Sequence, residues 1–492
     1  MGGLSAAEFN YANVQGESEF NRYEAEFLLC GRARLNNFVS GEKIIDFVQY
    51  GTSEELNEGG RGYPTLRLNE IDGCFIQEPV KHCDRIKPDE FNALRLRSGD
   101  VLICRTNGNP RLVGKASIVM EDTEVAYASY LFRLRPNGLI SPATLVTYLN
   151  ATSGRKEIER FTLLGNQANF SPAKFREIRI PVFSKQLIQR IDELLAAAYY
   201  AHKLALSFYS DAMEQLLDVL RLQNWQPSNS NSAIKKFSDS FSANGRLDAE
   251  YYQPKYDAWA ERIKQHPAGF AELVMACQIK EENFSPDEAQ TYLYIELADI
   301  GSHGNVMGAT KDVGAALPTR ARRRVSVGDV VVSSIEGSLQ SVALVTADYD
   351  NALCSTGFYV VRSDTINPET LLVLFKSEAY QNLFKQACTG TILTAMPREF
   401  FGCIPVPVID SAVQQIIAEK IQASFAARRH SQQHIELAKQ TVERAIESNE
   451  TEALEWLQEQ LVLLEVSELG NHEIAQGKAK PIAGVVQRLR IK

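Results

Sequence analysis

The chain of 492 residues contains one long stretch twice. The run GDVLI at 99–103 returns 229 positions later as GDVVV at 328–332, and LRLNEI at 66–71 returns at the same offset as IELADI at 295–300. An interval of 229 residues is far longer than the unit of a solenoid repeat. The duplication therefore predicts two similar domains related by a pseudo-twofold axis.

Shorter matches extend the duplication on both sides. RYEAEF at 22–27 returns as RLDAEY at 246–251, and IPV at 180–182 returns as IPV at 404–406. The offset drifts only slightly, as expected when the loops of one ancestral domain change length after a tandem duplication. Two such domains would suit the reading of two halves of one target. The other matched residues are Arg135 with Arg362, Pro142 with Pro368, Leu145 with Leu371, Gly165 with Gly390, Pro172 with Pro397, and Phe175 with Phe400.

The composition is that of an ordinary soluble globular protein. Hydrophobic residues make up 45% and charged residues 23% of the chain, and no run approaches the roughly 20 apolar residues of a membrane helix. The first residues lack the basic start and apolar core of a signal peptide, and eight cysteines without a CxxC pair predict reduced thiols. We therefore expect a cytoplasmic protein. A net charge of −9 argues against a surface made for nonspecific nucleic-acid binding but leaves room for a local basic cleft.

Short apolar runs between Gly, Pro and Asn predict strands in both copies. Helices are expected after Ser141-Pro142 and after Ser171-Pro172, because a proline in the first turn suits a helix start. Both copies are therefore predicted to be α+β domains. The chain divides into an N-terminal segment (1–27), a first domain (28–183), a first long helix (184–223), a Ser- and Asn-rich linker (224–245), a second domain (246–408), a second long helix (409–447) and a C-terminal tail (448–492).

A heptad pattern follows each domain. After the first domain, apolar residues alternate spacings of four and three without interruption, which indicates a helix packed lengthwise against another. The second pattern is weaker, with Arg428, Gln432 and Lys439 in its face. Each helix is the other's expected partner, in an antiparallel coiled coil that would set the domains at opposite ends. The seam residues are Ile191, Leu195, Ala198, Ala205, Ala212 and Leu216 in the first helix and Ile421, Phe425, Ile435 and Val442 in the second.

The tail has no counterpart after the first domain. Its leucines at 454, 457, 461 and 464 predict a helix rich in glutamate, and a basic end follows. The sequence assigns no role to this segment.

The sequence lacks the motifs of common nucleotide-, cofactor- and metal-dependent enzymes. It contains no GxxxxGK[ST] loop and no GxGxxG after a predicted strand. Asn109-Pro110 is followed by Arg111 rather than by the second proline of a methyltransferase motif. His430 and His434 lie one helical turn apart, but no third metal ligand accompanies them. We predict a non-catalytic chain that has no metal or cofactor of its own.

The duplicated motifs resemble those of a known family. Each copy has a Gly-Asp turn before an apolar strand, then a Gly-x-x-x-x-[Phe/Ala]-x-Pro-x-x-Phe element that leads into Ile-Pro-Val and a long helix. In this order and in duplicate, the motifs resemble the specificity (S) subunit of type I restriction–modification systems over about residues 20–447. The extra tail and the polar second seam depart from the family pattern, which leaves the subunit stoichiometry open.

The resemblance implies a function. Each globular unit would be a target recognition domain that reads one half of a split, asymmetric sequence in double-stranded DNA, and the paired helices would fix the gap between the halves. The helices would also dock two DNA adenine methyltransferase (M) subunits, and restriction (R) motor-nuclease subunits would join through that assembly. S-adenosylmethionine is expected on the partner methyltransferase and not on this chain.

Residues that contact DNA are expected in loops where the copies diverge, because the shared residues build the scaffold. Arginine suits guanine edges and phosphates, and asparagine suits adenine edges. The shared Gly99-Asp100 and Gly328-Asp329 are assigned to turns. The candidates are Arg61, Tyr63, Arg105, Asn107, Asn109, Arg111, Lys115, Asn166, Gln167 and Asn169 in the first domain, and Arg320, Arg322, Arg323, Arg324, Ser334, Ser338, Gln340, Thr391 and Thr394 in the second.

Each candidate also has a plainer interpretation. The arginines and asparagines of the first domain would equally serve as solvated turn residues, and the arginine cluster at 320–324 as a phosphate clamp rather than a base reader. This cluster is taken as the rough counterpart of the glycine-rich loop around Arg61.

Three other functions remain open. One is a DNA-recognition module of another defence complex, without restriction activity. Another is a two-headed protein scaffold, which the acidic pI of about 5.5 favours, and a third is an enzyme with an unfamiliar site. A scaffold would show no salt-sensitive DNA binding, whereas phosphate contacts make log K fall with log salt.

Overall fold

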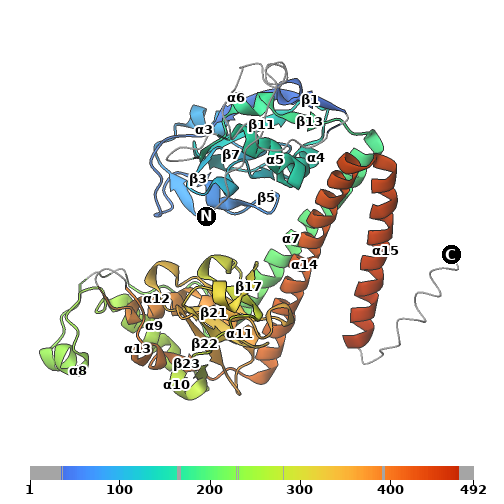
Figure 1. Cartoon of the computed structure of the whole chain (residues 1–492). Helices are drawn as coiled ribbons and strands as arrows, with labels where there is room; N and C mark the ends of the chain where they lie inside the picture. The colour runs from blue at the N-terminus through green and yellow to red at the C-terminus, as the bar shows by residue number, and fades with distance from the viewer. Residues whose placement is uncertain are drawn as a thin grey trace. The chain divides into compact units, whose positions relative to one another are not determined.

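A computed structural model describes residues 35, 37–162, 168–228, 230, 232–280, 282–390 and 394–475 of the chain. The chain divides into two compact units: unit 1 comprises Met1–His202 and Arg429–Lys492, and unit 2 comprises Lys203–Arg428. Each unit combines one α+β domain with parts of two long helices (Figure 1). The predicted α+β class and the paired long helices are thus confirmed. The expected N-terminal segment 1–27 lies outside the described residues.

The main sheet of unit 1 has six strands in the order β2-β11-β7-β9-β5-β4. Its strand β7 is the VLIC run after the Gly-Asp turn, and every residue of it is buried. Val101 and Ile103 belong to one hydrophobic core, whereas Leu102 and Cys104 belong to another, because successive side chains of a strand point to opposite faces. The strands are β2 (Ile45–Tyr50), β11 (Leu131–Pro136), β7 (Val101–Cys104), β9 (Ala116–Ile118), β5 (Phe75–Ile76) and β4 (Ile71–Asp72).

A smaller sheet and several helices complete unit 1. The small sheet has the order β10-β3-β6, with β10 parallel and β6 antiparallel to β3. Both helices predicted from the Ser-Pro pairs are confirmed, and Ser141 caps the first by accepting a hydrogen bond from Thr144 N at 3.0 Å. The elements are β1 (Phe38–Ser40), β3 (Tyr63–Leu66), β6 (Lys81–Cys83), α3 (Pro88–Leu94), β8 (Thr106–Asn107), β10 (Ala126–Tyr127), α4 (Pro142–Asn150), α5 (Thr152–Phe161), β12 (Ala168–Asn169), α6 (Pro172–Glu177) and β13 (Arg179–Pro181).

Unit 2 repeats this plan. Its main sheet has the order β15-β22-β19-β20, and its second sheet, β17-β16-β21-β18, contains the same kind of parallel pair, β16 with β21. The elements are α8 (Phe241–Asn244), α9 (Pro254–Lys264), β14 (Phe270–Glu272), α10 (Leu273–Ala276), β15 (Gln278–Lys280), β16 (Thr291–Ile295), β17 (Thr310–Val313), β18 (Ala321–Arg324), β19 (Val330–Ser333), β20 (Val342–Leu344), β21 (Leu353–Ser355), β22 (Phe358–Arg362), α11 (Pro368–Lys376), α12 (Glu378–Ala387), α13 (Arg398–Gly402) and β23 (Pro405–Pro407).

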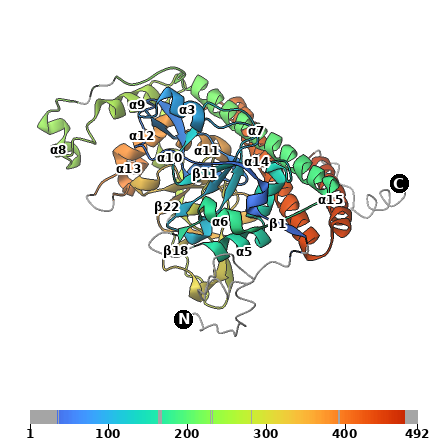
Figure 2. The same cartoon turned by 90° about the horizontal axis from the view of Figure 1, so that it is seen from above.

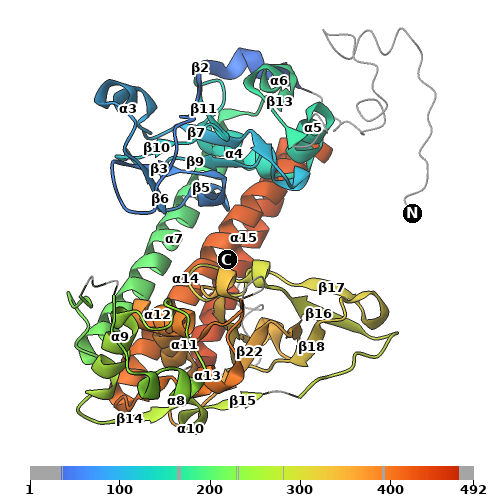
Figure 3. The same cartoon turned by 90° about the vertical axis from the view of Figure 1, so that its left-hand side faces the viewer.

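The two long helices are α7 (Lys185–Val219) and α14 (Ser411–Glu447), which run side by side in Figures 1 and 3. In unit 1 the start of α7 shares a core with the end of α14, and in unit 2 the end of α7 shares a core with the start of α14, so the pair is antiparallel. Helix α7 ends four residues before the expected boundary at 223, just ahead of Arg221, whose φ of +55° is left-handed. The seam residues Ile191, Leu195, Ala198, Ala205, Ala212, Leu216, Ile421, Ile435 and Val442 are buried, and Phe425 is partly buried.

Polar residues in the α14 seam make their own contacts. Ser424 donates a hydrogen bond to Ala205 O at 2.7 Å. Lys420 forms an ion pair with Asp211 at 3.2 Å. Burial lowers the pKa of the Arg428 guanidinium. Hydrogen bonds and ion pairs thus replace part of the apolar packing in this half of the pair.

The tail forms α15 (Glu450–Ala475), a third helix that lies beside α14 in unit 1 (Figure 2). Ala453 and Leu457 are fully or almost fully buried, and Leu454, Leu461 and Leu464 pack against the core of unit 1. Asn449 caps the helix by accepting a hydrogen bond from Glu452 N at 3.0 Å. The leucine pattern therefore marks a packed helix, whereas the basic end at 476–492 lies outside the described residues.

Candidate nucleic-acid interface

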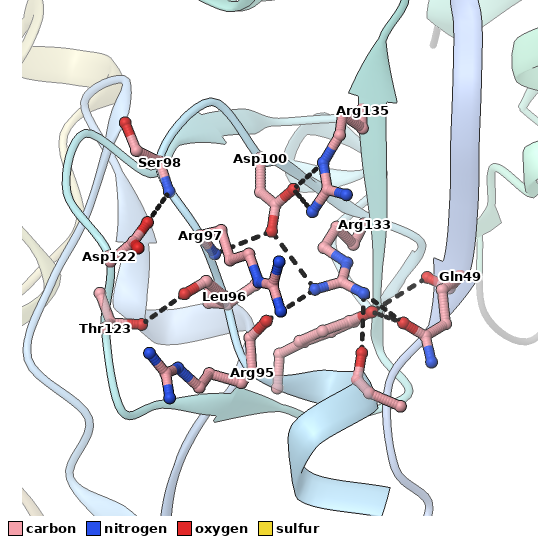
Figure 4. A network of polar contacts seen from close by, with 12 residues as sticks. Gln49, Arg95, Leu96, Arg97, Ser98, Asp100, Asp122, Thr123, Arg133 and Arg135 are labelled. Carbon is pink, nitrogen blue, oxygen red and sulfur yellow. Dashed lines mark hydrogen bonds and ion pairs between the residues drawn. The ribbon is translucent and has the colours of Figure 1, made fainter.

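The Gly-Asp turn of unit 1 is a buried ion-pair site (Figure 4). Asp100 is fully buried, and its Oδ2 accepts a hydrogen bond from Arg97 N at 2.9 Å. Its Oδ1 accepts from Nε and Nη2 of Arg135 at 2.9 and 2.6 Å. Gly99 closes the turn at a φ of +85°, which favours glycine.

Unit 2 repeats this turn. Asp329 is fully buried and accepts from Ser326 N at 2.8 Å and from Arg362 Nε at 2.9 Å. Gly328 has a φ of +84°. The shared motif is thus a structural turn in both units, as the sequence predicted, and its carboxylate holds the strand before the candidate loop in place.

The second cation of each turn comes from a different strand. In unit 1, Arg133 on β11 lies 3.3 Å from Asp100. In unit 2, Lys280 on β15 lies 2.7 Å from Asp329. Strand β15 pairs with β22 as β2 pairs with β11, so the second cation lies on the central strand in unit 1 and on the neighbouring strand in unit 2. The buried carboxylate is paired with a second cation in both units.

The two candidate loops of unit 1 lie together. Strand β8, in the loop after β7, pairs with β12, so that Asn107 lies opposite Ala168 and Thr106 opposite Asn169. The Asn169 amide donates to Thr106 Oγ1 at 3.0 Å. Candidates Asn166 and Gln167 lie outside the described residues.

The asparagines of the first loop shape its turn. Asn107 Oδ1 accepts from Asn109 N at 2.8 Å, and Asn109 Oδ1 accepts from Arg111 N at 3.1 Å. Arg111 itself is exposed. Arg105 donates to Ser129 O at 3.2 Å, and its guanidinium lies 5.1 Å above the ring of Tyr50. The asparagines thus act at least as turn formers, while the two arginines present their charge at the surface of the loop.

A basic cavity lies behind this loop. It has a volume of about 190 Å³ and is lined by Arg111, Lys115, Arg155 and Lys439 together with Cys74, Asn150 and apolar residues, and no carboxylate lines it. The charged residues of this lining are all cationic, although the whole chain has a net charge of −9, and one of them, Lys439, is paired with Glu436 at 3.2 Å.

The third candidate loop of unit 1 has its own contacts. Arg61 is exposed and lies 3.4 Å from the Asp84 carboxylate. The Tyr63 ring stacks on Phe91 with centroids 3.8 Å apart. Tyr63 therefore helps to pack α3 against β3. Of the two candidate residues in this loop, Arg61 is exposed and Tyr63 is half-buried.

The equivalent loops of unit 2 also lie together. Glu336 N donates to Thr394 O at 3.0 Å, and Ile335 forms a bridge with Ala395. Ser334 donates to Gly357 O at 2.9 Å, and the Ser338 hydroxyl lies 2.9 Å from that of Ser333. Gln340 is exposed, and candidate Thr391 lies outside the described residues. The chemistry of this surface is hydroxyl and amide rather than guanidinium.

The arginine cluster lies in a different place from the loop around Arg61. Its residues form β18 and the turn before it, and β18 pairs with β21 on the side of the sheet away from β16. Arg323 donates to Lys280 O at 3.1 Å, and Arg322 donates to Thr319 O at 2.9 Å. Arg324 lies 4.1 Å above the ring of Phe284, and Arg320 is exposed. The two segments are therefore not structural counterparts, contrary to the expectation from sequence.

Two exposed tyrosines beside Arg105 were missed by the sequence analysis. Tyr50 is 47% exposed under the Arg105 guanidinium, and Tyr130 is 51% exposed and accepts a backbone hydrogen bond from Arg105 N. In the sequence, these two residues are marked only as tyrosines at the ends of strands β2 and β11, which is a weak indication of a binding surface. Exposed aromatic rings next to arginines are typical of surfaces on which unstacked nucleic-acid bases stack.

No metal site and no membrane helix is found in the described part of the chain. Among those residues, no group of three or more His, Cys, Asp and Glu is arranged to hold a metal ion. His434 Nδ1 lies 2.8 Å from His430 O, within one turn of α14. None of the described helices is long and apolar enough to span a bilayer.

Known proteins resemble this chain to different degrees. No family model matches it. The specificity subunit of the type I restriction enzyme StySPI from Salmonella potsdam is 27% identical over 167 residues, which cover 31% of this chain and 34% of that subunit. The match thus spans about a third of the relative's length. It confirms the resemblance to type I specificity subunits that the duplicated motifs predict.

Two solved structures are also similar in part. The crystal structure of the S subunit of a type I restriction–modification system from M. genitalium has 12% identity and a TM-score of 0.35, and the match covers 85% of this chain and 98% of that one. The HsdS subunit from Thermoanaerobacter tengcongensis has 13% identity and a TM-score of 0.27, with 84% and 97% covered.

Proposed function

We propose that this chain is the DNA specificity subunit of a type I restriction–modification system and that it catalyses no reaction itself. Units 1 and 2 would each read one half of a split sequence in double-stranded DNA. The observation that carries the proposal is the duplicated scaffold, repeated down to the ion pairs of Asp100 and Asp329, with loops of different chemistry after equivalent strands. The name of the matched StySPI subunit supports the same role.

The two half-sites should differ in sequence. Unit 1 presents guanidinium groups from Arg105 and Arg111, which suit guanine edges and phosphates. Unit 2 presents an amide from Gln340, which suits adenine edges, and hydroxyls from Ser334 and Ser338, which suit donors and acceptors of several bases. Each mismatched base pair typically costs about 1–3 kcal/mol, so two half-sites read together discriminate far better than one.

The long helices would dock the partners. In this proposal α7 and α14 bind two adenine methyltransferase subunits, which carry S-adenosylmethionine, and restriction subunits join through them in the cytoplasm. Large side chains on the outer faces of these helices, Tyr200 at 67% and Ile416 at 41% exposure, are suited to a protein contact. Methylation of a base within a duplex requires that the base be flipped out, at a cost of a few kcal/mol. Tight anchoring by the recognition units would help to offset that cost.

A methylome comparison between the native strain and a strain without this gene tests the proposal. We expect loss of methylation at one split, asymmetric adenine motif. Co-purification of the chain with methyltransferase subunits tests the docking part. A full set of methylated motifs in the deletion strain, together with no salt-sensitive binding of the purified chain to duplex DNA, would overturn the proposed function.

A further inference from the structure

A side chain of α5 holds the candidate loop of unit 1 from behind. Arg155 Nη2 donates to Val113 O at 2.6 Å and to Arg111 O at 3.0 Å. Val113 is fully buried, so its carbonyl marks the point where the loop enters the core. Among the described residues, Arg155 forms no ion pair with a carboxylate. Its guanidinium group therefore makes hydrogen bonds to backbone carbonyls of the loop that carries Arg111.

A side chain of α12 makes the equivalent contact in unit 2. Gln381 Nε2 donates to Leu339 O at 3.2 Å and to Phe375 O at 2.7 Å. Leu339 is 7% exposed, so here too the anchored carbonyl belongs to a buried aliphatic residue. The loop that carries Ser334, Ser338 and Gln340 is thus held in the same way.

The two contacts occupy the same register. Arg155 is the fourth residue of α5, which begins at Thr152, and Gln381 is the fourth residue of α12, which begins at Glu378. Val113 and Leu339 each lie three residues before the next strand, which begins at Ala116 in unit 1 and at Val342 in unit 2. The loops themselves differ in length, 105–115 against 334–341. The contact has therefore stayed fixed while the loop in front of it has changed.

A second anchor lies at the end of the preceding helix. Asn150, the last residue of α4, donates to Ala116 O at 2.7 Å and accepts from Ala116 N at 3.1 Å. Lys376, the last residue of α11, donates to Gln340 O at 2.8 Å. Each unit thus uses one cation and one amide, and the two groups have exchanged positions between the copies.

We propose that Arg155 and Gln381 are positioning residues that set the specificity of the two recognition loops without touching DNA. The inference rests on the proposed function and deepens it, because it assigns to each half-site a separate support behind the loop. A loop whose tip is exposed needs such a support to present its side chains in one geometry, since base readout depends on hydrogen bonds of defined direction.

Substitution of one anchor by the residue type of the other tests this proposal. Gln381 holds its carbonyl from the same register as Arg155, so the inference predicts that a glutamine at 155 can supply the donor there. Arg155→Gln should therefore keep the loop in place, whereas Arg155→Met removes the donor and keeps much of the bulk. Lys156→Met is the control for loss of one positive charge from α5, because Lys156 is exposed and adjacent.

Hydrogen–deuterium exchange of the full chain tests the anchor itself. In Arg155→Met we expect faster exchange in 105–115 and unchanged exchange in 334–341, and in Gln381→Met the reverse. Arg155→Gln and Lys156→Met should exchange like the wild type. Unchanged exchange in both Met variants, or faster exchange across a whole unit, would overturn the anchor.

Methylome sequencing of strains that carry the same variants then tests specificity. Arg155→Met should relax discrimination roughly 10-fold at one half of the motif only, and Gln381→Met at the other half. Arg155→Gln should restore the wild-type motif. A wild-type strain without any motif that depends on this gene would count against the proposed function, whereas an intact motif in both Met variants would count against the inference alone.

Discussion

At the scale of single residues, the turns of Asp100 and Asp329 show what duplication preserves. A buried carboxylate is costly unless it is paired, and removal of one partner from a buried pair typically costs about 3–5 kcal/mol. The arginine that follows, Arg135 or Arg362, has stayed in place in both units. The second cation has moved between neighbouring strands, as Arg133 or Lys280. The pairing of the carboxylate is thus retained although one of its partners is not.

Lys376 gives a pH prediction at the same scale. It is 8% exposed, and burial lowers its pKa from 10.5 to about 8. The unfolded chain therefore binds more protons than the folded chain between pH 8 and pH 10.5, and this residue makes stability rise with pH across that window. A shift of this size corresponds to roughly 3 kcal/mol.

Lys376→Met should remove that contribution. Between pH 7.5 and pH 9.5, we expect the free energy of unfolding of the wild type to rise relative to that of the variant. Urea denaturation at both pH values measures the two free energies. Parallel pH profiles of the two proteins would contradict the prediction. Lys385→Met is a suitable control, because Lys385 is an exposed lysine of the neighbouring α12.

At the scale of elements, the copies differ most clearly at α3 and β18. After the shared strands, unit 1 has the segment PDEFNAL, with a proline in the first turn and acidic residues after it, and this forms α3. Unit 2 has ARRR, whose residues pair with β21 as a strand instead. A change of local sequence has therefore changed the type of element, while the strands that the two units share kept their order around it.

Helix α15 supports a prediction about packing. Leu457 is 1% exposed within the core of unit 1, whereas Leu463 on the same helix is 60% exposed. Leu457→Ala should destabilise the docking of α15 by about 2–5 kcal/mol, because it removes buried methyl groups and leaves a cavity. Leu463→Ala should change stability by about 0.5 kcal/mol or less. Limited proteolysis within 450–475 reports the difference, and equal cleavage of both variants would contradict the packing.

At the scale of the whole molecule, the two units carry separate candidate loops for DNA contact. Arg105→Ala combined with Arg111→Ala should weaken binding to DNA through one half-site only, and each lost phosphate contact should reduce the slope of log K against log salt by about 1. Adding Ser334→Ala and Gln340→Ala should lower affinity further by an independent factor, since the effects of sites that share no partner residues usually add. Fluorescence anisotropy with duplexes altered in either half checks this. Equal loss on both altered duplexes would remove the assignment of Arg105 and Arg111.

Much of this organisation can be predicted from the sequence, and the limits have physical causes. The duplication follows from direct comparison of two segments of the sequence, and the helices after Ser141 and Ser171 and the heptad seam follow from patterns within a few residues of each other. The roles of Arg155 and Gln381 cannot be predicted in this way, because each side chain bonds a carbonyl about 42 residues away in sequence. A hydrogen bond to a backbone carbonyl places no requirement on the side chain of the residue that accepts it. The prediction that Arg320–Arg324 is the counterpart of the loop around Arg61 was wrong. Strand β18 in unit 2 occupies the position of helix α3 in unit 1, so the sequences of the two copies cannot be aligned there.

The register of the anchors has a consequence for engineering. In each copy the exposed loop and both of its supports lie within one continuous stretch, from β7 to Arg155 or from β19 to Gln381. A graft that carries this whole stretch would bring both supports with it, so that only the contacts of the loop with residues 168–169 or 394–395 would need to be matched in the recipient. A graft of the loop alone would leave behind the side chains that fit its length.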